Sequence, residues 1–415
     1  GQQSLTTSSL TWRNAGSIVR NPDSSLLPDL DSLPLPAYHL LPTCARDSGI
    51  IDAGRGCPFQ CTFCSTSVFW KRRFRLKSIE RILHEIRTLK GYGATAFTFQ
   101  HDLFTVNRRR INEFCDRLLD EKLEISWGCS ARVDCVTADL LDHMGRAGCN
   151  AIFYGVETGS ARMQQIIRKK LKLNQVWETL NATLKAGISP TVSFIAGFPD
   201  ETEEDLQQTL NMIQALLGTP KVSVQLHLLG PEPGTPDYQH YHDRLRLDGY
   251  HSDIAGTVYR FQEPEWFRKY PDLFSSFYYY ESAAMPRDLL RGLDLFIHAP
   301  CAILRKTVNR LFEGGRSLWQ LYNDWRSFAD QRGLGLGPSA GQKLEDYLLD
   351  FYAFLDWEVA AQRSDIDLGT TRDEILTHLF LHHGEVPVRI VPRTRRTSRP
   401  RRSRRKMTRV VNSAG

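Results

Sequence analysis

The chain has 415 residues, 41% of them hydrophobic, and a formal net charge of +6. This length predicts two or three domains with sizeable cores. No run approaches 18 consecutive apolar residues, which argues against a membrane-spanning helix. Residues 389–415 carry 11 Lys and Arg and no acid, so the rest of the chain has a net charge of −5 and shows no nucleic-acid-binding pattern.

Residues 1–45 are rich in Ser, Pro, Leu and Asp and show no sustained hydrophobic period. The stretch 26–37, LLPDLDSLPLPA, is typical of an extended segment stiffened by proline. We therefore expect residues 1–45 to form a linker-like N-terminal segment.

Three cysteines, Cys57, Cys61 and Cys64, form a CxxxCxxC motif in a loop that also contains Gly56 and Pro58. Thiolates suit iron–sulfur clusters and zinc, and three of them leave one metal position open. A zinc knuckle and a chance group of buried thiols remain alternatives at this point. Disulfides are not expected, because the chain has nine cysteines, an odd number, and no visible signal peptide. We therefore expect a reducing, cytoplasmic location.

Strands and helices alternate from about residue 48 to residue 229, which predicts a parallel sheet built from βα units. We expect strands at residues 49–53, 95–100, 124–129, 151–155, 190–196 and 222–228. We expect helices at residues 78–90, 106–121, 137–146, 160–168, 175–186 and 203–217. The pattern fits a partial (β/α)6 barrel, and a doubly wound sheet would give the same periodicity.

Polar residues follow several of these strands, at the end where parallel α/β folds bind ligands. Asp102 follows the second strand, Ser130 and Arg132 the third, and Glu157 the fourth. A turn-capping role is the alternative for Asp102, and a salt bridge with a neighbouring acid is the alternative for Arg132.

The βα rhythm stops near residue 238. Apolar patterns predict helices at residues 289–296, 303–312, 317–328 and 342–363, so we expect a mainly helical C-terminal domain over residues 240–386. Residues 387–415 form a low-complexity basic tail, predicted to be disordered and solvated; binding to a nucleic acid or an acidic partner is the alternative.

The CxxxCxxC motif, with the aromatic Phe63 before its last cysteine, resembles the signature of the radical S-adenosylmethionine (radical SAM) superfamily. The resemblance implies a partial (β/α)6 TIM-like barrel over residues 46–239. It also implies a [4Fe–4S] cluster on Cys57, Cys61 and Cys64, and reductive cleavage of S-adenosylmethionine to a 5′-deoxyadenosyl radical. In such a family the cofactors carry the chemistry and the protein binds and orients them.

A second element, YGVETGS at residues 154–160, resembles one found in the cobalamin-dependent and methylthiotransferase branches of the superfamily. The proline-rich stretch at 26–37 also resembles the linker that follows the cobalamin domain in the first of these branches. We expect that N-terminal cobalamin domain to be missing from this chain. Cobalamin use is therefore open, and a separate cobalamin-binding subunit is one alternative.

The resemblance assigns cofactor-binding roles to six residues outside the three cysteines: Phe63, Asp102, Ser130, Arg132, Glu157 and Ile195. Phe63 and the main chain near Ile195 would lie against the adenine. Glu157 would accept hydrogen bonds from the ribose hydroxyls or the amino group. Asp102 and Arg132 would hold the methionine moiety, Arg132 through its carboxylate.

The sequence thus predicts a radical SAM enzyme that abstracts hydrogen, with C-methylation of a natural product or peptide as one outcome. The alternatives are a cobalamin-independent oxidoreductase or cyclase, and a non-catalytic iron–sulfur scaffold. The expected partners are a small-molecule or peptide substrate and a reductant such as flavodoxin or ferredoxin, with no membrane.

Overall fold

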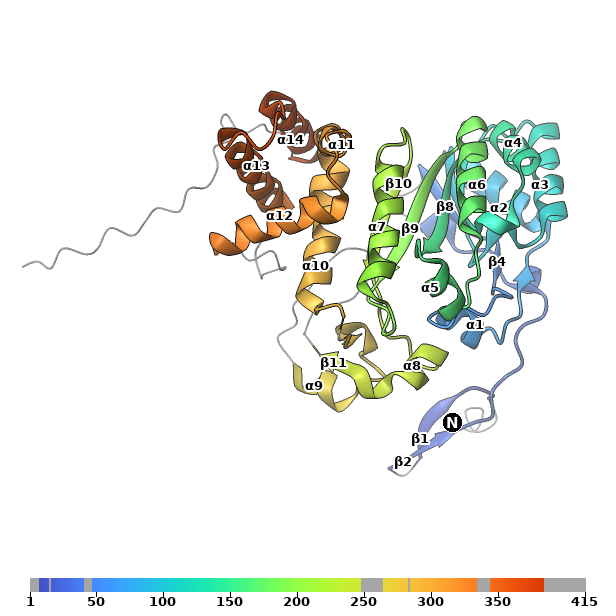
Figure 1. Ribbon diagram of the computed structural model, residues 1–415. Coiled ribbons are helices and arrows are strands. Elements are labelled where there is room, and N and C mark those ends of the chain that lie inside the picture. Colours follow the sequence, from blue (N-terminus) through green and yellow to red (C-terminus); the bar gives the residue numbers. More distant parts are fainter. Residues whose placement is uncertain are drawn as a thin grey trace, which may run out of the picture.

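The computed structural model describes residues 7–14, 16–40, 47–247, 264–282, 284–333 and 344–383 (Figure 1). At its centre is a six-stranded parallel sheet in the order β10-β9-β8-β7-β6-β3. Its strands are β3 (Ser48–Asp52), β6 (Ala96–Gln100), β7 (Ser126–Ala131), β8 (Cys149–Glu157), β9 (Ser189–Ala196) and β10 (Ser223–Leu228). Sequential strands are neighbours throughout, so the order never reverses as it does in a doubly wound sheet. The expected α/β architecture is confirmed, with β3 and β10 at the two edges of the sheet.

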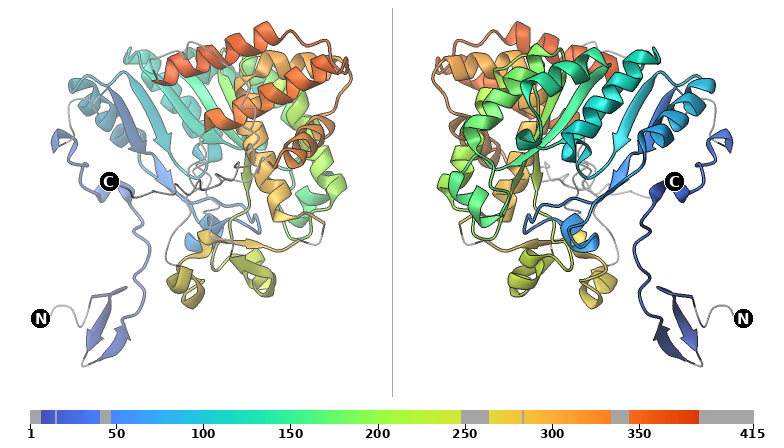
Figure 2. Two further views of the ribbon diagram at one scale, coloured as in Figure 1. Left: turned by 90° about the vertical axis from the view of Figure 1, so that its left-hand side faces the viewer. Right: turned by 90° about the vertical axis from the view of Figure 1, so that its right-hand side faces the viewer.

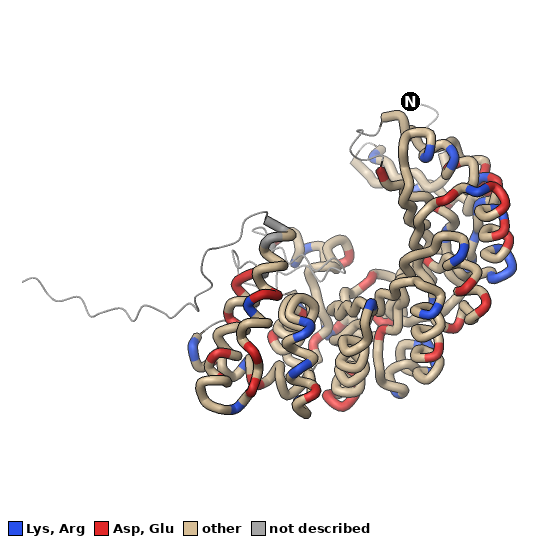
Figure 3. The backbone as a smooth tube through the Cα atoms, turned by 90° about the horizontal axis from the view of Figure 1, so that it is seen from above, with Lys and Arg blue, Asp and Glu red and all other residues tan. Residues whose placement is uncertain are grey.

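Helices cover one face of the sheet (Figures 1 and 2). They are α2 (Ile79–Gly91), α3 (Arg108–Asp120), α4 (Ala138–Arg146), α6 (Leu173–Lys185) and α7 (Glu203–Leu217). The short helix α5 (Ala161–Ile166) lies below them near α1 and belongs to a smaller hydrophobic cluster that includes Phe198. Helix α7 begins with a capping box, in which Thr202 and Asp205 bind each other's backbone N–H. Charged residues of both signs are mixed along these outer helices (Figure 3).

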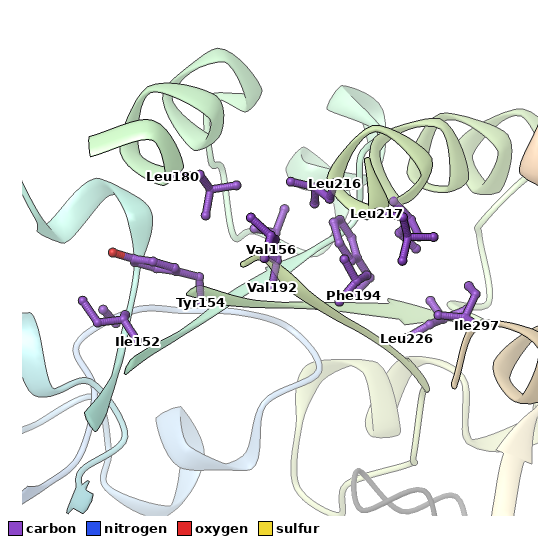
Figure 4. Close-up of a cluster of buried hydrophobic side chains, with 14 of the residues drawn as sticks. Ile152, Tyr154, Val156, Leu180, Val192, Phe194, Leu216, Leu217, Leu226 and Ile297 are labelled. Carbon is purple, nitrogen blue, oxygen red and sulfur yellow. The ribbon is translucent and has the colours of Figure 1, made fainter. Parts of the chain in front are cut away.

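The core lies between the sheet and these helices (Figure 4). Val192 and Phe194 of β9 are fully buried there and face Leu216 of α7. Because side chains alternate along a strand, Ser193 and Ile195 point to the opposite, inner face of the sheet. The outer face of the sheet therefore packs in the hydrophobic core, and the inner face is available for a binding site.

The predicted N-terminal linker contains more structure than expected. Strands β1 (Thr11–Asn14) and β2 (Ser17–Arg20) form an antiparallel hairpin, which lies away from the sheet in Figure 2. Two short 3-10 turns follow, at Leu30–Ser32 and Tyr38–Leu40. The Tyr38 hydroxyl donates to Glu85 of α2 at 2.9 Å, so this segment is fastened to the sheet's helices.

The C-terminal region is mainly helical, as predicted. Its helices are α10 (Arg287–Phe296), the π-helix η9 (Ile297–Cys301), α11 (Arg305–Glu313), α12 (Leu318–Gln331), α13 (Leu344–Ala360) and α14 (Leu368–His383). Along the chain, α8 (Pro236–His240), β11 (Leu245–Leu247), α9 (Pro264–Lys269) and β12 (Tyr278–Tyr280) follow the sheet and precede these helices, and α8, α9 and β11 lie at the bottom of Figure 1. The predicted basic tail lies outside the described residues, and the domain boundaries stay predictions.

Arg305 joins the helical region to the sheet. Its guanidinium donates to the carbonyl oxygens of Leu217 and Val222 at 2.7 Å each, and to those of Leu216 and Thr219 at 3.1 and 2.7 Å. These carbonyls end α7 and lead into β10, and a cation at a helix C-terminus satisfies groups that have no partner within the helix. The helical region is therefore bound to the edge of the sheet by polar contacts as well as packing.

Candidate active site

The cysteine loop lies in a small closed unit that the sequence did not reveal. Strand β4 (Gly54–Arg55) precedes the loop, α1 (Ser65–Phe69) follows it, and β4 pairs antiparallel with β5 (Arg75–Leu76). Gly56 adopts φ +101°, and a Cβ there would collide with the carbonyl oxygen of Arg73. Only glycine fits this position, because both the conformation and the space exclude a side chain.

Asp102 fastens the cysteine loop to the sheet. Its carboxylate accepts the Gly56 N–H at 2.7 Å and the Thr66 hydroxyl at 3.1 Å, on either side of the three cysteines. Asp102 thus binds the cysteine loop and does not cap the 3-10 turn Phe104–Val106 that follows it, whose N-cap residue is Leu103. A role toward the methionine moiety stays a prediction.

The three thiols are half-buried, and none forms a disulfide. Burial raises the pKa of Cys57, and it raises that of Cys61 to about 11, while the positive charges of Lys169 and Arg132 act in the opposite direction on Cys61. Within the described residues, no three His, Cys, Asp or Glu side chains gather around a single ion position. A cubane cluster does not need this, because each cysteine ligates a different iron. Three thiols beside two buried cations fit an anionic iron–sulfur cluster.

Arg132 lies beneath the cysteine loop. Its guanidinium stacks on the Phe59 ring at 3.7 Å, and its Nη1 is 4.0 Å from the Cys61 sulfur. It also forms two hydrogen bonds to the Asp134 carboxylate, at 3.0 and 2.8 Å. The neighbouring-acid salt bridge is thus present, and binding of the methionyl carboxylate stays a prediction.

Glu157 ends β8 with φ +70°, just after an irregularity in the β8–β9 register. Such a conformation is uncommon for a residue with a side chain, and it often marks a functional site. Its carboxylate binds Lys169 Nζ at 2.5 Å, and both side chains are at least nine-tenths buried. A Cβ at Gly155 would collide with the Glu157 Oε1 and lie 2.9 Å from the Lys169 Nζ, so a larger residue there would displace this pair.

A cavity of about 340 Å³ opens between the cysteine loop and the carboxyl ends of β8, β9 and β10. Three of the predicted residues line it: Phe63, Glu157 and Ile195. It is also lined by Cys64, Ser65, Thr66, Phe153, Ser193, His227, Leu228, Leu229, Gly230, Glu232 and Ser276. The structure thus brings the third cysteine, an aromatic face and a buried carboxylate to one cavity.

The other three predicted residues do not line this cavity. Asp102 and Arg132 contact the cysteine loop instead, and Ser130 lies on β7 opposite Phe153 of β8. The sequence reasoning missed Lys169, which is 12 residues from its partner Glu157, and it missed the cavity residues Ser193 and His227. The register of β9 against β10, which pairs Ile195 with His227, could have located His227 once Ile195 was proposed.

Comparison with known proteins identifies this region. Residues 51–213 match the family model of the radical SAM superfamily. The chain carries a radical SAM domain. Radical SAM proteins use a [4Fe–4S] cluster and S-adenosylmethionine. The predicted superfamily and these two cofactors are therefore confirmed.

Two curated relatives are similar to the radical SAM domain. An uncharacterized methyltransferase of Pyrococcus horikoshii is 32% identical over 54% of this chain and 50% of its own length. An anaerobic magnesium-protoporphyrin IX monomethyl ester cyclase of Cereibacter sphaeroides is 30% identical over 48% of this chain and 33% of its own length. The chain thus spans half or less of the length of these relatives.

A solved structure extends the similarity beyond the radical SAM domain. The cobalamin-dependent S-adenosylmethionine radical enzyme OxsB superposes with a TM-score of 0.59 and 14% identity, over 92% of this chain and 65% of its own. At this identity the match shows shared fold, and its coverage includes much of the helical region. Among the described residues, none of the helices combines the length and apolarity needed to cross a bilayer.

Proposed function

We propose that this chain is the catalytic core of a radical SAM enzyme. A [4Fe–4S] cluster on Cys57, Cys61 and Cys64 would supply the electron that cleaves S-adenosylmethionine and gives a 5′-deoxyadenosyl radical for hydrogen abstraction. The observation that carries this proposal is the cavity, onto which Cys64, Phe63 and Glu157 all open. A non-catalytic iron–sulfur scaffold would not need such a cavity beside its cluster.

The cavity residues have distinct proposed roles. Phe63 lies edge-on to Phe198, with ring centroids 5.6 Å apart, and this fixes its ring at the cavity wall for contact with adenine. Ile195 supplies apolar surface from the neighbouring strand. Glu157 would share its carboxylate between Lys169 and the ribose hydroxyls or amino group, since a carboxylate accepts several hydrogen bonds.

The remaining predicted residues would act around the methionine moiety. Asp102 keeps the cysteine loop in place, and Arg132 holds positive charge next to Cys61. That charge favours the thiolate form that binds iron. Ser130, on the inner face of β7, is the proposed polar contact on that side.

The proposed substrate class rests on the two curated relatives named above. The relatives named above are a methyltransferase and a ring-forming cyclase, so we propose a hydrogen abstraction that leads to C-methylation or ring formation on a small molecule. Cobalamin, from a separate domain or subunit, would be used for methylation, while a cobalamin-independent oxidoreductase or cyclase is the second candidate. A flavodoxin or ferredoxin in a reducing cytoplasm would supply the electron.

The test is anaerobic reconstitution with iron and sulfide, followed by dithionite and S-adenosylmethionine. We expect about four irons per chain and 5′-deoxyadenosine as a product, measured by chromatography and mass spectrometry. Substrate and cobalamin are not needed for this readout, because abortive cleavage releases the same nucleoside. Full iron loading without 5′-deoxyadenosine would contradict the proposed function.

A further inference from the structure

We propose that the turn after the cysteine loop, residues 69–75, is the docking surface for the acidic protein that reduces the cluster, a flavodoxin or a ferredoxin. This basic turn has the sequence Phe-Trp-Lys-Arg-Arg-Phe-Arg. The inference rests on the proposed function, because a low-potential partner is needed only where a cluster must be reduced.

The basic turn is fixed directly against the cysteine loop. Strands β4 and β5 pair Arg55 with Arg75, so the cysteines and the basic turn belong to one closed unit. The backbone of Arg73 packs on Gly56, the residue before Cys57. On the other side, the turn begins at Phe69, the last residue of α1, five residues or about 7.5 Å of helix after Cys64. A protein seated on the basic turn therefore lies beside the cluster ligands.

Three cations of the turn point into solvent. Lys71, Arg72 and Arg73 are exposed, and no carboxylate in the described part of the chain forms an ion pair with them. Their backbone N–H groups donate to carbonyls within the unit at 3.2, 2.9 and 3.0 Å, so the turn is ordered. Lys71 and Arg72 hold φ values of +52° and +57°, a conformation that is uncommon for residues with a side chain.

Apolar side chains lie among these charges. Phe69 is 68% exposed, and Val68 and Phe74 are each 40% exposed. Arg75, by contrast, is engaged within the protein, because it donates to the Leu27 carbonyl and stacks on Trp70. The surface thus combines exposed apolar side chains with exposed cations, as in protein–protein interfaces that charge complementarity steers.

The position of the basic turn, beside the cysteine loop, favours a redox protein over other acidic partners. A nucleic acid would find phosphate contacts here, but the basic turn offers one small surface rather than a stripe of cations. Electron-transfer complexes bury little area and depend on charge for their association rate. In the complex one electron would leave the partner's flavin or iron–sulfur centre, which is oxidised, and would reduce a [4Fe–4S] cluster held by Cys57, Cys61 and Cys64; no atom would be transferred.

The test compares two reductants, a redox protein and dithionite, on three variants. The triple variant Lys71→Glu, Arg72→Glu, Arg73→Glu reverses the charge of the basic turn. Its control, Lys122→Glu, Lys185→Glu, Lys221→Glu, makes the same change just before β7, β9 and β10, at the opposite ends of the strands. A second variant with Gln at positions 71, 72 and 73 removes the charge without reversing it.

Two readouts are expected to respond. Binding of oxidised flavodoxin or ferredoxin, titrated by calorimetry at low salt, should weaken at least 10-fold in the charge-reversal variant, less in the Gln variant, and not in the control. Formation of 5′-deoxyadenosine with the reduced protein partner should slow at least 10-fold, while the rate with dithionite and the iron content should stay unchanged.

The outcomes separate this inference from the proposed function. Unchanged binding and unchanged partner-driven rate in the charge-reversal variant would overturn the docking surface and leave the enzyme standing. An unaltered chain that binds single-stranded oligonucleotide through the basic turn but neither redox protein would also overturn it. An unaltered chain that makes no 5′-deoxyadenosine with dithionite would overturn the proposed function. The binding titration would then still show whether the basic turn binds the redox protein.

Discussion

The sheet region and the C-terminal helical region both bury charged and aromatic side chains, but they differ in where the buried charges lie. In the sheet region, the Glu157–Lys169 pair and Arg132 are buried beside the cysteine loop, whereas in the helical region the buried Glu358 forms an ion pair with Arg316. In the helical region the centre is aromatic: Trp325 packs on Phe296 and Phe351, with ring centroids 5.3 and 5.7 Å apart. Desolvating charge costs free energy, so the charges buried beside the cysteine loop indicate a site, whereas the aromatic packing around Trp325 supports the fold.

The two regions meet at β10, where the boundary is not purely apolar. His298, in the π-helix η9, hydrogen-bonds the Leu226 carbonyl at 2.7 Å and lies 3.4 Å from Asp294. Its ring is 5.8 Å from that of His227, which lines the cavity on the same strand. The helical region therefore contacts the cavity-lining strand β10. The following predictions test whether the sheet region and the helical region are stable independently of each other.

The largest effect should come from Cys61→Ala, because it removes one of three proposed iron ligands. We expect loss of the visible absorbance of the reconstituted cluster and no 5′-deoxyadenosine. Cys115→Ala is the matched control: its thiol is fully buried on α3, so iron loading should be retained. Equal iron content in the two variants would contradict the assignment of the cluster to the motif.

Trp325→Ala should damage the other region. Trp325 is fully buried, and truncating such a side chain costs about 3–5 kcal/mol of the free energy of unfolding. We expect faster hydrogen exchange in α10–α13 and unchanged iron loading. Trp319→Ala, at a half-buried position on the same helix, should cost much less. Loss of the cluster in Trp325→Ala would show that the sheet region cannot hold its site without the helical support.

Glu157→Ala should leave the cluster and weaken S-adenosylmethionine binding. One lost charge-assisted hydrogen bond is worth about 1.5–3 kcal/mol, or about 10- to 150-fold in affinity, measured by calorimetry on the reconstituted chain. Glu178→Ala, at an exposed position on α6, is the control and should bind normally. Unchanged affinity in Glu157→Ala would mean that this carboxylate serves only to neutralise Lys169.

The strands and helices could largely be predicted from the sequence, because the apolar period follows the buried face of each element. Residues 190–196, for example, were expected as a strand, and β9 spans Ser189–Ala196. The two-residue strands β4 and β5 could not be found this way, since they are shorter than any period. The β1–β2 hairpin was missed because the Ser- and Pro-rich composition around it indicated a linker.

The site was predicted in part for a similar reason. Phe63 and Glu157 belong to short sequence motifs that can be recognised without the structure. Both reach the cavity because the cysteine loop and the end of β8 lie at the carboxyl edge of the sheet. Lys169 was missed because its pairing depends on how the chain turns after α5, where Arg168 and Lys170 both adopt positive φ. For Arg132 the sequence left two roles open, and the structure contains the salt bridge with Asp134, while binding of the methionyl carboxylate stays a prediction.

The smallest expected effect is a pH dependence located in the sheet region. Burial raises the pKa of Glu201 to about 8, against the hydrogen bond that its carboxylate accepts from Gly197 N–H at 2.7 Å. Because the native state keeps this proton while the unfolded chain loses it near pH 4.5, the stabilisation is complete below that pH and is lost as the pH rises through 8. Between pH 6 and 8 the free energy of unfolding should fall by about 2 kcal/mol more in the unaltered chain than in Glu201→Gln.

In the helical region, burial raises the pKa of Asp294 to about 6. Measurements above pH 6 therefore report mainly on Glu201, whose pKa is about 8, and less on Asp294. Denaturant unfolding at the two pH values measures the difference, and Glu203→Gln, at an exposed position in the first turn of α7, should behave like the unaltered chain. If hydrogen exchange between pH 6 and 8, corrected for its intrinsic pH dependence, quickened in α12 as much as in β9, the two regions would unfold as one unit. If it quickened only around β9 and α7, the sheet region would carry its own stability together with its site.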